Sequence, residues 1–244
     1  MDPSAYTQMA DTESRHWWFV ARREILRGEL ERLALGPGSR LLEVGSGTGG
    51  NLELLSHYGK LSAMEMDASA RALANGKTGG RFDIRFGHCP DNIPFESGEF
   101  DLICMFDVLE HIDEDVETLQ ALTPLLAEGG RMLVTVPAYA WLWGAHDEFL
   151  HHKRRYNRRN FEALVAAAGL RLERFSYFNT LLFPLAAAVR IKERLLHSEH
   201  AAGQGLPAPW LNEVLQRTFA SERWLLGRTT LPYGVSLLAV LGAR

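Results

Sequence analysis

Short apolar runs alternate with amphipathic segments through most of the chain. The runs that we expect to form strands cover residues 40–44, 61–66, 82–87, 100–106, 132–136 and 170–178, and those at 40–44 and 100–106 are mostly apolar, as buried strands are. The segments between them carry apolar residues three or four positions apart, as helices do, and cover residues 50–57, 69–76, 113–126 and 160–168. Strands that alternate with helices predict parallel βαβ units in a doubly wound sheet.

The part of the chain that follows the sixth run has a different pattern. Helical spacing returns at residues 180–196 and 210–226, on either side of a glycine- and proline-rich loop at 197–209. Residues 234–241 are apolar and predict a seventh strand. If that strand rejoins the sheet, the helices before it form an insertion over the strand ends, where ligands bind in such folds.

The segment that precedes the first strand is also helical by its spacing, over residues 6–35, and Gly36-Pro37-Gly38 ends it. We therefore predict a single α/β domain with a doubly wound, mostly parallel seven-stranded sheet, an N-terminal helical cap and a helical insertion before the last strand. Its parts are the cap at 1–36, the ligand-binding core at 37–178, the insertion at 179–232 and the last strand at 233–244.

Composition narrows the class of protein without indicating its chemistry. The 244 residues are 46% hydrophobic and carry a formal net charge of -4, which excludes a disordered chain and disfavours a general nucleic-acid binder. Two cysteines cannot form a disulfide framework and favour a reducing, cytoplasmic setting. The first residues lack the pattern of a signal peptide, and no apolar run approaches the ~20 residues of a transmembrane helix.

A glycine-rich loop directly after the first strand is the strongest local signal. It reads Gly45-Ser46-Gly47-Thr48-Gly49-Gly50, and glycines there let the backbone turn sharply and approach a ligand closely. Glu65 ends the second strand about 20 residues later, where a carboxylate can accept hydrogen bonds from ribose hydroxyls. The spacing fits both a dinucleotide such as NAD and another adenosine cofactor. The alternative is a loop that only connects strand to helix.

Further motifs follow in order along the chain and bear on this choice. They are Gly87-His88-Cys89-Pro90, the run at 98–103, Asp107-Val108-Leu109-Glu110-His111, the run at 125–131 and Thr135-Val136-Pro137. This series, over about 41–172, resembles the class I S-adenosylmethionine (SAM)-dependent methyltransferases, type 11-like and related to the ubiquinone-biosynthesis enzymes. The resemblance implies SAM as cofactor, with S-adenosylhomocysteine as its product.

The resemblance also implies which residues bind SAM. Those around its methionine part would be Glu43, Gly45, Ser46, Gly47 and Gly49. Those around its adenosine would be Glu65 on the ribose hydroxyls, Met66 on the adenine face, and His88 and Cys89 at the adenine edge. Those near the sulfonium would be Phe106, Asp107 and Val108. His88 departs from many relatives, which carry an aspartate there that accepts from the adenine amino group.

Methyl transfer to oxygen usually needs a base, and histidine suits that role because its pKa lies near neutrality. The segment after the fifth strand offers His146 and Asp147 as a base or substrate anchor, followed by His151 and His152. The alternative for His146 and Asp147 is that they tie down a loop.

The basic run Lys153-Arg154-Arg155 is a candidate for binding an anionic acceptor, with Tyr156 adding a hydrogen bond. The alternative is a solvated charged face. In the N-terminal segment, Trp18 serves packing or substrate contact, and Arg22 is a candidate to close over the substrate or the cofactor carboxylate. With His152, these residues form the expected substrate-binding set.

A metal is a further alternative that we do not expect. Some quinone-pathway relatives hold a divalent ion on a Glu-x-x-Glu-His sequence, and this chain has Asp107, Glu110 and His111 at those positions. Glu110 and His111 more often brace a helix start.

We expect a methyltransferase that acts on a small-molecule or lipid- or sugar-linked acceptor at oxygen, without nucleic acid. The apolar stretch at 181–195 leaves open an ordinary lid, an oligomer contact or a peripheral membrane contact. The rival functions are an NAD-type oxidoreductase, and a non-catalytic protein of the same fold that binds or assembles with a partner.

Overall fold

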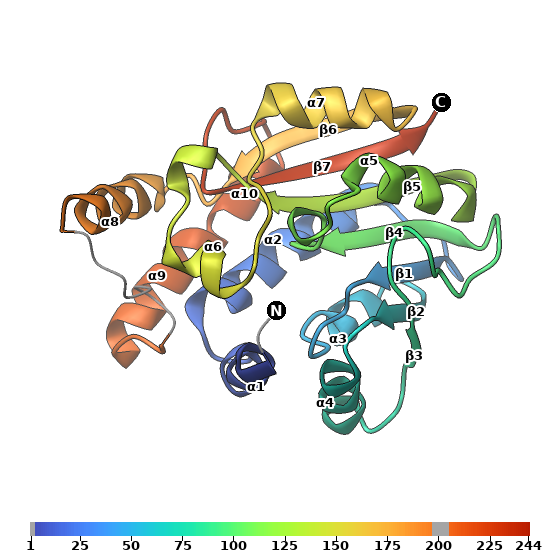
Figure 1. Cartoon of the computed structure of the whole chain (residues 1–244), viewed down its shortest axis with the longest axis horizontal. Helices are drawn as coiled ribbons and strands as arrows, with labels where there is room; N and C mark the ends of the chain where they lie inside the picture. The colour runs from blue at the N-terminus through green and yellow to red at the C-terminus, as the bar shows by residue number, and fades with distance from the viewer. Residues whose placement is uncertain (1–2, 197–204) are drawn as a thin grey trace.

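A seven-stranded sheet of order β3-β2-β1-β4-β5-β7-β6 forms the centre of the molecule (Figure 1). The computed structural model describes residues 3–196 and 205–244. The strands are β1 (Arg40–Val44), β2 (Lys60–Glu65), β3 (Asp83–Phe86), β4 (Phe100–Phe106), β5 (Leu126–Pro137), β6 (Leu170–Phe178) and β7 (Ser236–Ala243). Only β7 runs antiparallel to its neighbours β5 and β6. This confirms the predicted mostly parallel, doubly wound α/β fold.

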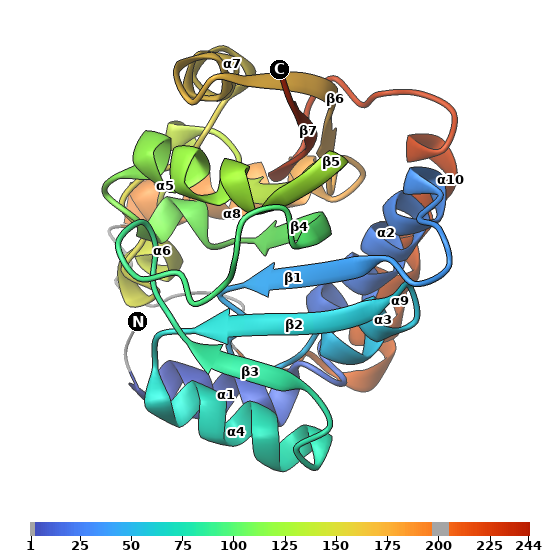
Figure 2. The same ribbon diagram turned by 90° about the vertical axis from the view of Figure 1, so that its right-hand side faces the viewer.

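The helices lie on both faces of this sheet (Figure 2). They are α1 (Pro3–Thr12), α2 (Trp17–Leu33), α3 (Leu52–Ser56), α4 (Ala68–Thr78), α5 (Asp115–Leu122), α6 (Ala145–Phe149), α7 (Arg158–Ala167), α8 (Phe183–Leu196), α9 (Pro209–Ala220) and α10 (Glu222–Leu226). The short helix α6 was not predicted, because five residues are too few to show a helical period.

The single helix expected at 6–35 is two helices, which corrects that prediction. His16 caps the second helix, and its ring nitrogen Nδ1 accepts from the Trp18 backbone N–H at 3.3 Å. The helix expected at 210–226 is likewise divided between α9 and α10, next to Ser221. The loop expected at 197–209 falls largely on residues 197–204, outside the described residues.

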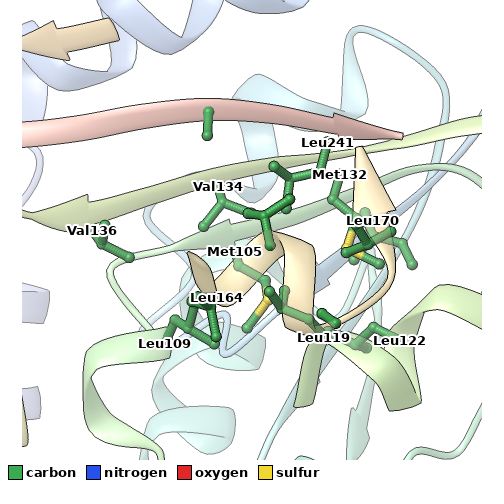
Figure 3. Packing of buried hydrophobic residues seen from close by; sticks show 14 of the residues in the cluster. Met105, Leu109, Leu119, Leu122, Met132, Val134, Val136, Leu164, Leu170 and Leu241 are labelled. Atoms are coloured by element: carbon green, nitrogen blue, oxygen red, sulfur yellow. The ribbon is translucent and has the colours of Figure 1, made fainter. Parts of the chain in front are cut away.

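Two apolar layers hold the helices against the sheet, because parallel strands bury both of their faces. In β1, Leu42 and Val44 face one layer while Leu41 faces the other. Figure 3 shows the first layer, where Met105 and Val134 pack against side chains of α5 and α7 such as Leu119 and Leu164. This alternation buries both faces of β1.

The cap and the insertion pack against each other in the second layer. The backbone N–H of Trp17 donates to the side-chain oxygen of Asn212 in α9 at 2.9 Å. Phe219, fully buried near the end of α9, contacts the ring of Trp17 edge-on and stacks on Phe178 at the end of β6. Segments about 200 residues apart in the sequence therefore cover the same side of the sheet (Figure 1).

The insertion leaves and rejoins the sheet at one place. Its two ends meet where the N–H of Val235 donates to the carbonyl of Asn179 at 3.3 Å, and Thr180 bonds to the Tyr233 carbonyl. The insertion thus begins at the carboxyl edge of the parallel strands with α8, and α9 and α10 pack against α2 on one face of the sheet. None of the helices in the described ranges has the length and apolarity that a membrane crossing requires.

Candidate functional site

The glycine loop after β1 turns through left-handed backbone conformations at Gly45, Gly47 and Gly49. At Gly45 (φ 69°) an added Cβ would lie 2.6 Å from the Val108 Cγ2 atom, so a side chain has no room there. The N–H groups of Gly45 and Ser46 both donate to the carbonyl of Met64 in β2. The loop is therefore tied to the sheet between the ends of β2 and β4, and Val108 packs against it as one wall.

Glu65 lies at the end of β2 with its carboxylate turned toward the glycine loop. One oxygen accepts from the Gly47 N–H at 2.8 Å and the other from the Asp67 N–H at 2.9 Å. The neighbouring Met66 side chain is 64% exposed. The placement suits the predicted roles of Glu65 on ribose hydroxyls and Met66 on an adenine face, and both roles stay predictions.

Glu43 places a carboxylate inside the protein beneath the same loop. One oxygen accepts from the Asn51 side-chain amide at 2.9 Å, and the other has no hydrogen-bond partner among the described residues. Burial raises the pKa of Glu43 to about 7, with the Asn51 hydrogen bond and Arg22 acting against that rise. An unpartnered buried carboxylate is costly and attracts a cation. The site therefore fits the ammonium group of the SAM methionine part, which Glu43 would hold.

His88 and Cys89 follow β3 and stand half-buried beside it. The N–H of His88 donates to the Asn92 carbonyl at 2.8 Å, which folds the segment back on itself. Burial raises the pKa of the Cys89 thiol to about 12, so the thiol stays protonated near neutral pH. Their place at the adenine edge stays a prediction.

The first helix adds residues to the cofactor side that the sequence did not single out. Glu13, in the turn between α1 and α2, accepts from the Thr48 hydroxyl at 2.9 Å and forms an ion pair with Lys77 of α4. Burial raises the pKa of Tyr6 in α1, and the charges of Glu65 and Asp67 raise it further. The helix α1 thus lies beside α4 at the glycine loop (Figure 2). The sequence signal for a separate first helix is the polar stretch at 13–16, which interrupts the helical spacing of residues 6–35.

Three strands end on a residue with a left-handed backbone at this edge of the sheet. Asp107 after β4, Tyr139 after β5 and Asn179 after β6 each have φ 57°. Such conformations cost about 1–3 kcal/mol for residues other than glycine, and they cluster at functional sites. All three lie at carboxyl ends of parallel strands, where ligands bind in doubly wound folds.

Asp107 is held by an arginine from the cap. Arg22 of α2 pairs with one Asp107 oxygen at 2.6 Å, and the Thr135 hydroxyl lies 3.3 Å from the other. The Arg22 guanidinium is nearly buried and lies over the rings of Trp18 and Phe106. The predicted residues Trp18, Arg22, Phe106 and Asp107 therefore form one contiguous wall. Arg22 contacts Asp107 here, and its predicted contact with a substrate or cofactor carboxylate stays a prediction.

Asp147 is fully buried at the start of α6 and is surrounded by donors. Arg155 binds it with two nitrogens at 2.7 and 3.0 Å, the His152 Nδ1 atom lies at 2.8 Å, and the Gly144 N–H donates at 2.9 Å. Burial alone would raise its pKa, but the hydrogen bonds from His152 and Arg155 outweigh it and hold the pKa well below its usual range. The carboxylate is thus ionised and engaged within the protein. Its predicted role as a base or substrate anchor stays a prediction.

Three imidazoles gather around this anchor. The ring of His152 lies 4.7 Å from that of His111 and 6.5 Å from that of His146, centroid to centroid. Burial lowers the pKa of His146 to about 4, although Asp147 opposes the shift. Burial also lowers the pKa of His111 to about 3, with the charge of His152 adding to it. Both rings are therefore neutral near pH 7 and can accept a proton or donate a lone pair.

The basic run is bound to carboxylates of the protein itself. Lys153 pairs with Asp113 at 2.9 Å, and Arg154 pairs with Asp115 at 2.7 Å. The Tyr156 hydroxyl donates to Asp115 at 2.9 Å, and Arg155 forms an ion pair with Asp147. Lys153 and Arg154 are partly exposed while they make these pairs, and Arg155 is buried. Binding of an anionic acceptor by Arg154, Arg155 and Tyr156 stays a prediction.

Comparison with known proteins assigns a family to this arrangement. A family model described as a methyltransferase domain matches residues 18–174, more than half of the chain. A solved complex between a methyltransferase activator and a methyltransferase described as putative, from Haloferax volcanii, contains a similar chain. The TM-score is 0.64 at 17% identity, with 98% of this chain and 93% of that chain covered. This last likeness shows the fold.

Two curated relatives agree with the family model. A probable SAM-dependent methyltransferase of Mycolicibacterium smegmatis is 24% identical over 161 residues, which cover 65% of this chain and 61% of the relative. An uncharacterized methyltransferase of Staphylococcus carnosus is 31% identical over 108 residues, covering 43% of this chain and 50% of the relative. The matches thus span between half and about three-fifths of the relatives' length. The glycine spacing alone fits both SAM and NAD, and the family match decides for SAM. The chain belongs to the methyltransferase domain family, within the class I SAM-dependent methyltransferases.

Proposed function

We propose that the protein transfers the methyl group of SAM to an oxygen atom of a small-molecule or lipid- or sugar-linked acceptor. When bound, SAM supplies a methyl group attached to a positively charged sulfur. The protein's contribution is then to hold donor and acceptor in line, and orientation of this kind can supply several kcal/mol. Glu65 and Glu43 would fix the two ends of the cofactor, and the wall of Arg22, Phe106 and Asp107 would exclude water beside the reacting atoms.

The observation that carries the choice of oxygen is the pair of neutral imidazoles, His111 after β4 and His146 after β5. An alcohol or phenol must lose its proton as it reacts, and the neutral ring of His146 can accept it near pH 7. The burial that lowers the pKa of His146 to about 4 also makes this ring a weaker base than a free imidazole. The acceptor oxygen would form the new carbon–oxygen bond as the methyl–sulfur bond breaks. Its proton would pass to His146 and then to solvent.

The nature of the acceptor is supported by the helix α8 at the rim. Leu185, Ile191 and Leu195 on this helix are each more than half exposed, and the exposed Lys192 stands among them. An apolar rim with a basic side chain suits an acceptor that carries a hydrocarbon or an anionic linked group. The ring of Tyr139 stacks on Tyr177 between this helix and the strand ends, and adds a flat apolar surface.

The experiment that tests the proposal uses SAM labelled with carbon-13 at its methyl group. The full chain is incubated with the labelled cofactor and with aqueous and lipid fractions of a bacterial extract. Carbon–proton correlation spectra then separate O-methyl, N-methyl, S-methyl and C-methyl signals by chemical shift before the product is known. The matched control is Glu65→Ala, which removes the predicted ribose contact.

The outcomes separate the proposal from its rivals. A new O-methyl signal that needs the protein and weakens in Glu65→Ala is the expected result. An N-methyl, S-methyl or C-methyl signal overturns the choice of oxygen and keeps the methyltransferase. Tight SAM binding by calorimetry with no labelled product in any fraction overturns the enzyme and favours the non-catalytic binding or assembly protein.

A further inference from the structure

Two histidines of the imidazole cluster and a neighbouring glutamate form a group of side chains that could bind a metal. Glu110 and His111 lie in a short 3-10 helix (Leu109–His111) after β4, and His152 follows α6. One ligand atom from each of the three lies within 4.8 Å of the others, and the His152 Nε2 atom is 4.0 Å from a Glu110 oxygen. Coordination at about 2.1 Å would place ligand atoms roughly 3.4 Å apart, so small side-chain rotations complete the set.

Glu110 is the member whose state most needs explanation. Its side chain is fully buried, and neither carboxylate oxygen receives a hydrogen bond from another described residue. A buried carboxyl group without partners is costly, and natural sites of this kind are paired or coordinate a metal. The His152 imidazole, 4.0 Å from a Glu110 oxygen, stops short of hydrogen-bond distance. A cation between Glu110 and His152 would satisfy both groups.

His152 is oriented in the way that metal-binding histidines are. Its Nδ1 atom is engaged by the Asp147 carboxylate at 2.8 Å, which leaves Nε2 directed at Glu110. Asp147 is itself fixed by the bidentate bond from Arg155. A carboxylate behind a ligating imidazole sets its tautomer and raises its basicity.

The set differs from the one that the sequence motif suggested. Asp107, the first position of that motif, is paired with Arg22 at 2.6 Å and is not part of the converging group. Its place is taken by His152, which lies about 40 residues further along the chain and reaches the site only through the fold. Spacing within one motif could not have included it.

We propose that Glu110, His111 and His152 bind one divalent transition-metal ion, with a coordination position left open. Two imidazoles and one carboxylate are a donor set for Zn²⁺ and for other ions of its size, and three protein ligands are typical of catalytic rather than structural sites. The use of the open position rests on the proposed function: there the ion would bind the acceptor oxygen and lower its pKa, while His146 takes the proton.

The binding test needs neither SAM nor an acceptor. The untagged full chain is stripped of metal with a chelator and dialysed against Zn²⁺, and bound zinc is measured by elemental analysis. Titration with Co²⁺ is followed by visible absorption, which reports the coordination number and detects any thiolate ligand. The variants are Glu110→Gln and His152→Gln. The matched control is His57→Gln, which replaces an exposed histidine at the end of α3.

The expected result is one zinc per chain in the wild type and in His57→Gln, with affinity at least 10-fold weaker in Glu110→Gln and His152→Gln. Zinc should also raise the melting temperature of the wild type and leave that of Glu110→Gln unchanged, since ligand binding stabilises only a state that binds. Glu110→Gln keeps the size of the side chain and removes a buried acid, so it should fold.

Three results overturn the proposal. The first is the absence of stoichiometric Zn²⁺ and Co²⁺ binding to folded wild-type protein. The second is equal binding by Glu110→Gln, and the third is a Co²⁺ spectrum with thiolate bands; either of these would place the ion elsewhere. Failure here is distinguishable from failure of the proposed function, because methyl transfer that persists in a chelator would retain the enzyme without the metal.

Discussion

Arg22 and Asp107 form an ion pair of 2.6 Å that joins the N-terminal cap to the carboxyl end of β4. The Arg22 side chain is 7% exposed and that of Asp107 is 21% exposed. Because Asp107 has a left-handed backbone, the pair also holds a strained position in the pocket wall. The cap is therefore a structural part of the candidate site and not an appendage to it.

Removing the arginine should destabilise the protein. Arg22→Met leaves Asp107 without its cation in a largely buried place, and we expect a loss of about 2–3 kcal/mol of unfolding free energy. Urea denaturation of the protein without cofactor measures it. The control is a double-mutant cycle with Asp107→Asn, in which the double variant should lose less unfolding free energy than the two single variants together. Strictly additive losses would show that the two side chains do not interact.

Replacing Glu65 should weaken cofactor binding. Glu65→Ala removes a charged acceptor for two hydroxyl groups, and we expect the SAM affinity to fall by about 1–3 kcal/mol. Isothermal titration calorimetry gives the value, and a melting curve without SAM checks that the loop still folds, since Glu65 also accepts from Gly47 and Asp67. Unchanged affinity would refute the ribose role.

Glu43 should make stability depend on pH in one direction. Its pKa in the folded protein is raised from 4.5 to about 7 by burial, so the folded state holds the proton more tightly than the unfolded state. The stabilising contribution of the Glu43 proton to the free energy of unfolding is full below pH 4.5 and is lost as the pH rises toward 7. The free energy of unfolding of Glu43→Gln, taken relative to that of the wild type, should therefore increase by about 2–3 kcal/mol between pH 4.5 and 7.

Chemical denaturation of the two proteins at several pH values measures this difference. The comparison must be made between variants, because His111 and His146 have lowered pKa values that change wild-type stability in the opposite sense. A difference that stays constant across this range would show that Glu43 is ionised in the folded protein throughout.

His146 should affect turnover and leave cofactor affinity nearly unchanged. A general base contributes about 10²-fold or more to a rate, so His146→Ala should lower turnover by at least that order once the acceptor is known. Because burial lowers the pKa of His146 to about 4, wild-type activity should not fall with its titration until the pH is well below 6. A fully active variant would remove His146 from catalysis.

Most of the strand pattern could be predicted from local sequence because strands such as β4 are short and mostly apolar, whereas β5 begins at Leu126, six residues before the predicted 132–136. Residues 100–106 and 170–178 coincide with β4 and β6 in full. The glycine loop and Glu65 also carry local signals, since a sharp turn and a strand-terminal carboxylate are visible in spacing alone. The fold prediction therefore succeeded where the determining interactions lie within about ten residues.

The contacts around Asp147 could not be predicted in the same way. The sequence shows Asp147 and Arg155 as a candidate catalyst and a candidate anion binder, and only the fold shows that they bind each other. Likewise Glu13 reaches Thr48 and Lys77 across more than 30 positions. Charge pairing at that range depends on how α1 and α6 pack, and short helices leave little periodic signal.

The hydrogen bond between Val235 and Asn179 joins the two ends of the insertion that contains α8 to α10, and we call this junction the neck. Because the chain leaves β6 and enters β7 at this one point, the intervening segment can be exchanged with that of a relative without altering the length or register of any strand. Phe219 and Leu226 must be kept, as both are fully buried against the sheet. Chimaeras joined at the neck should therefore keep the sheet intact, provided that α9 retains its contacts with the cap, such as that of Asn212 with Trp17.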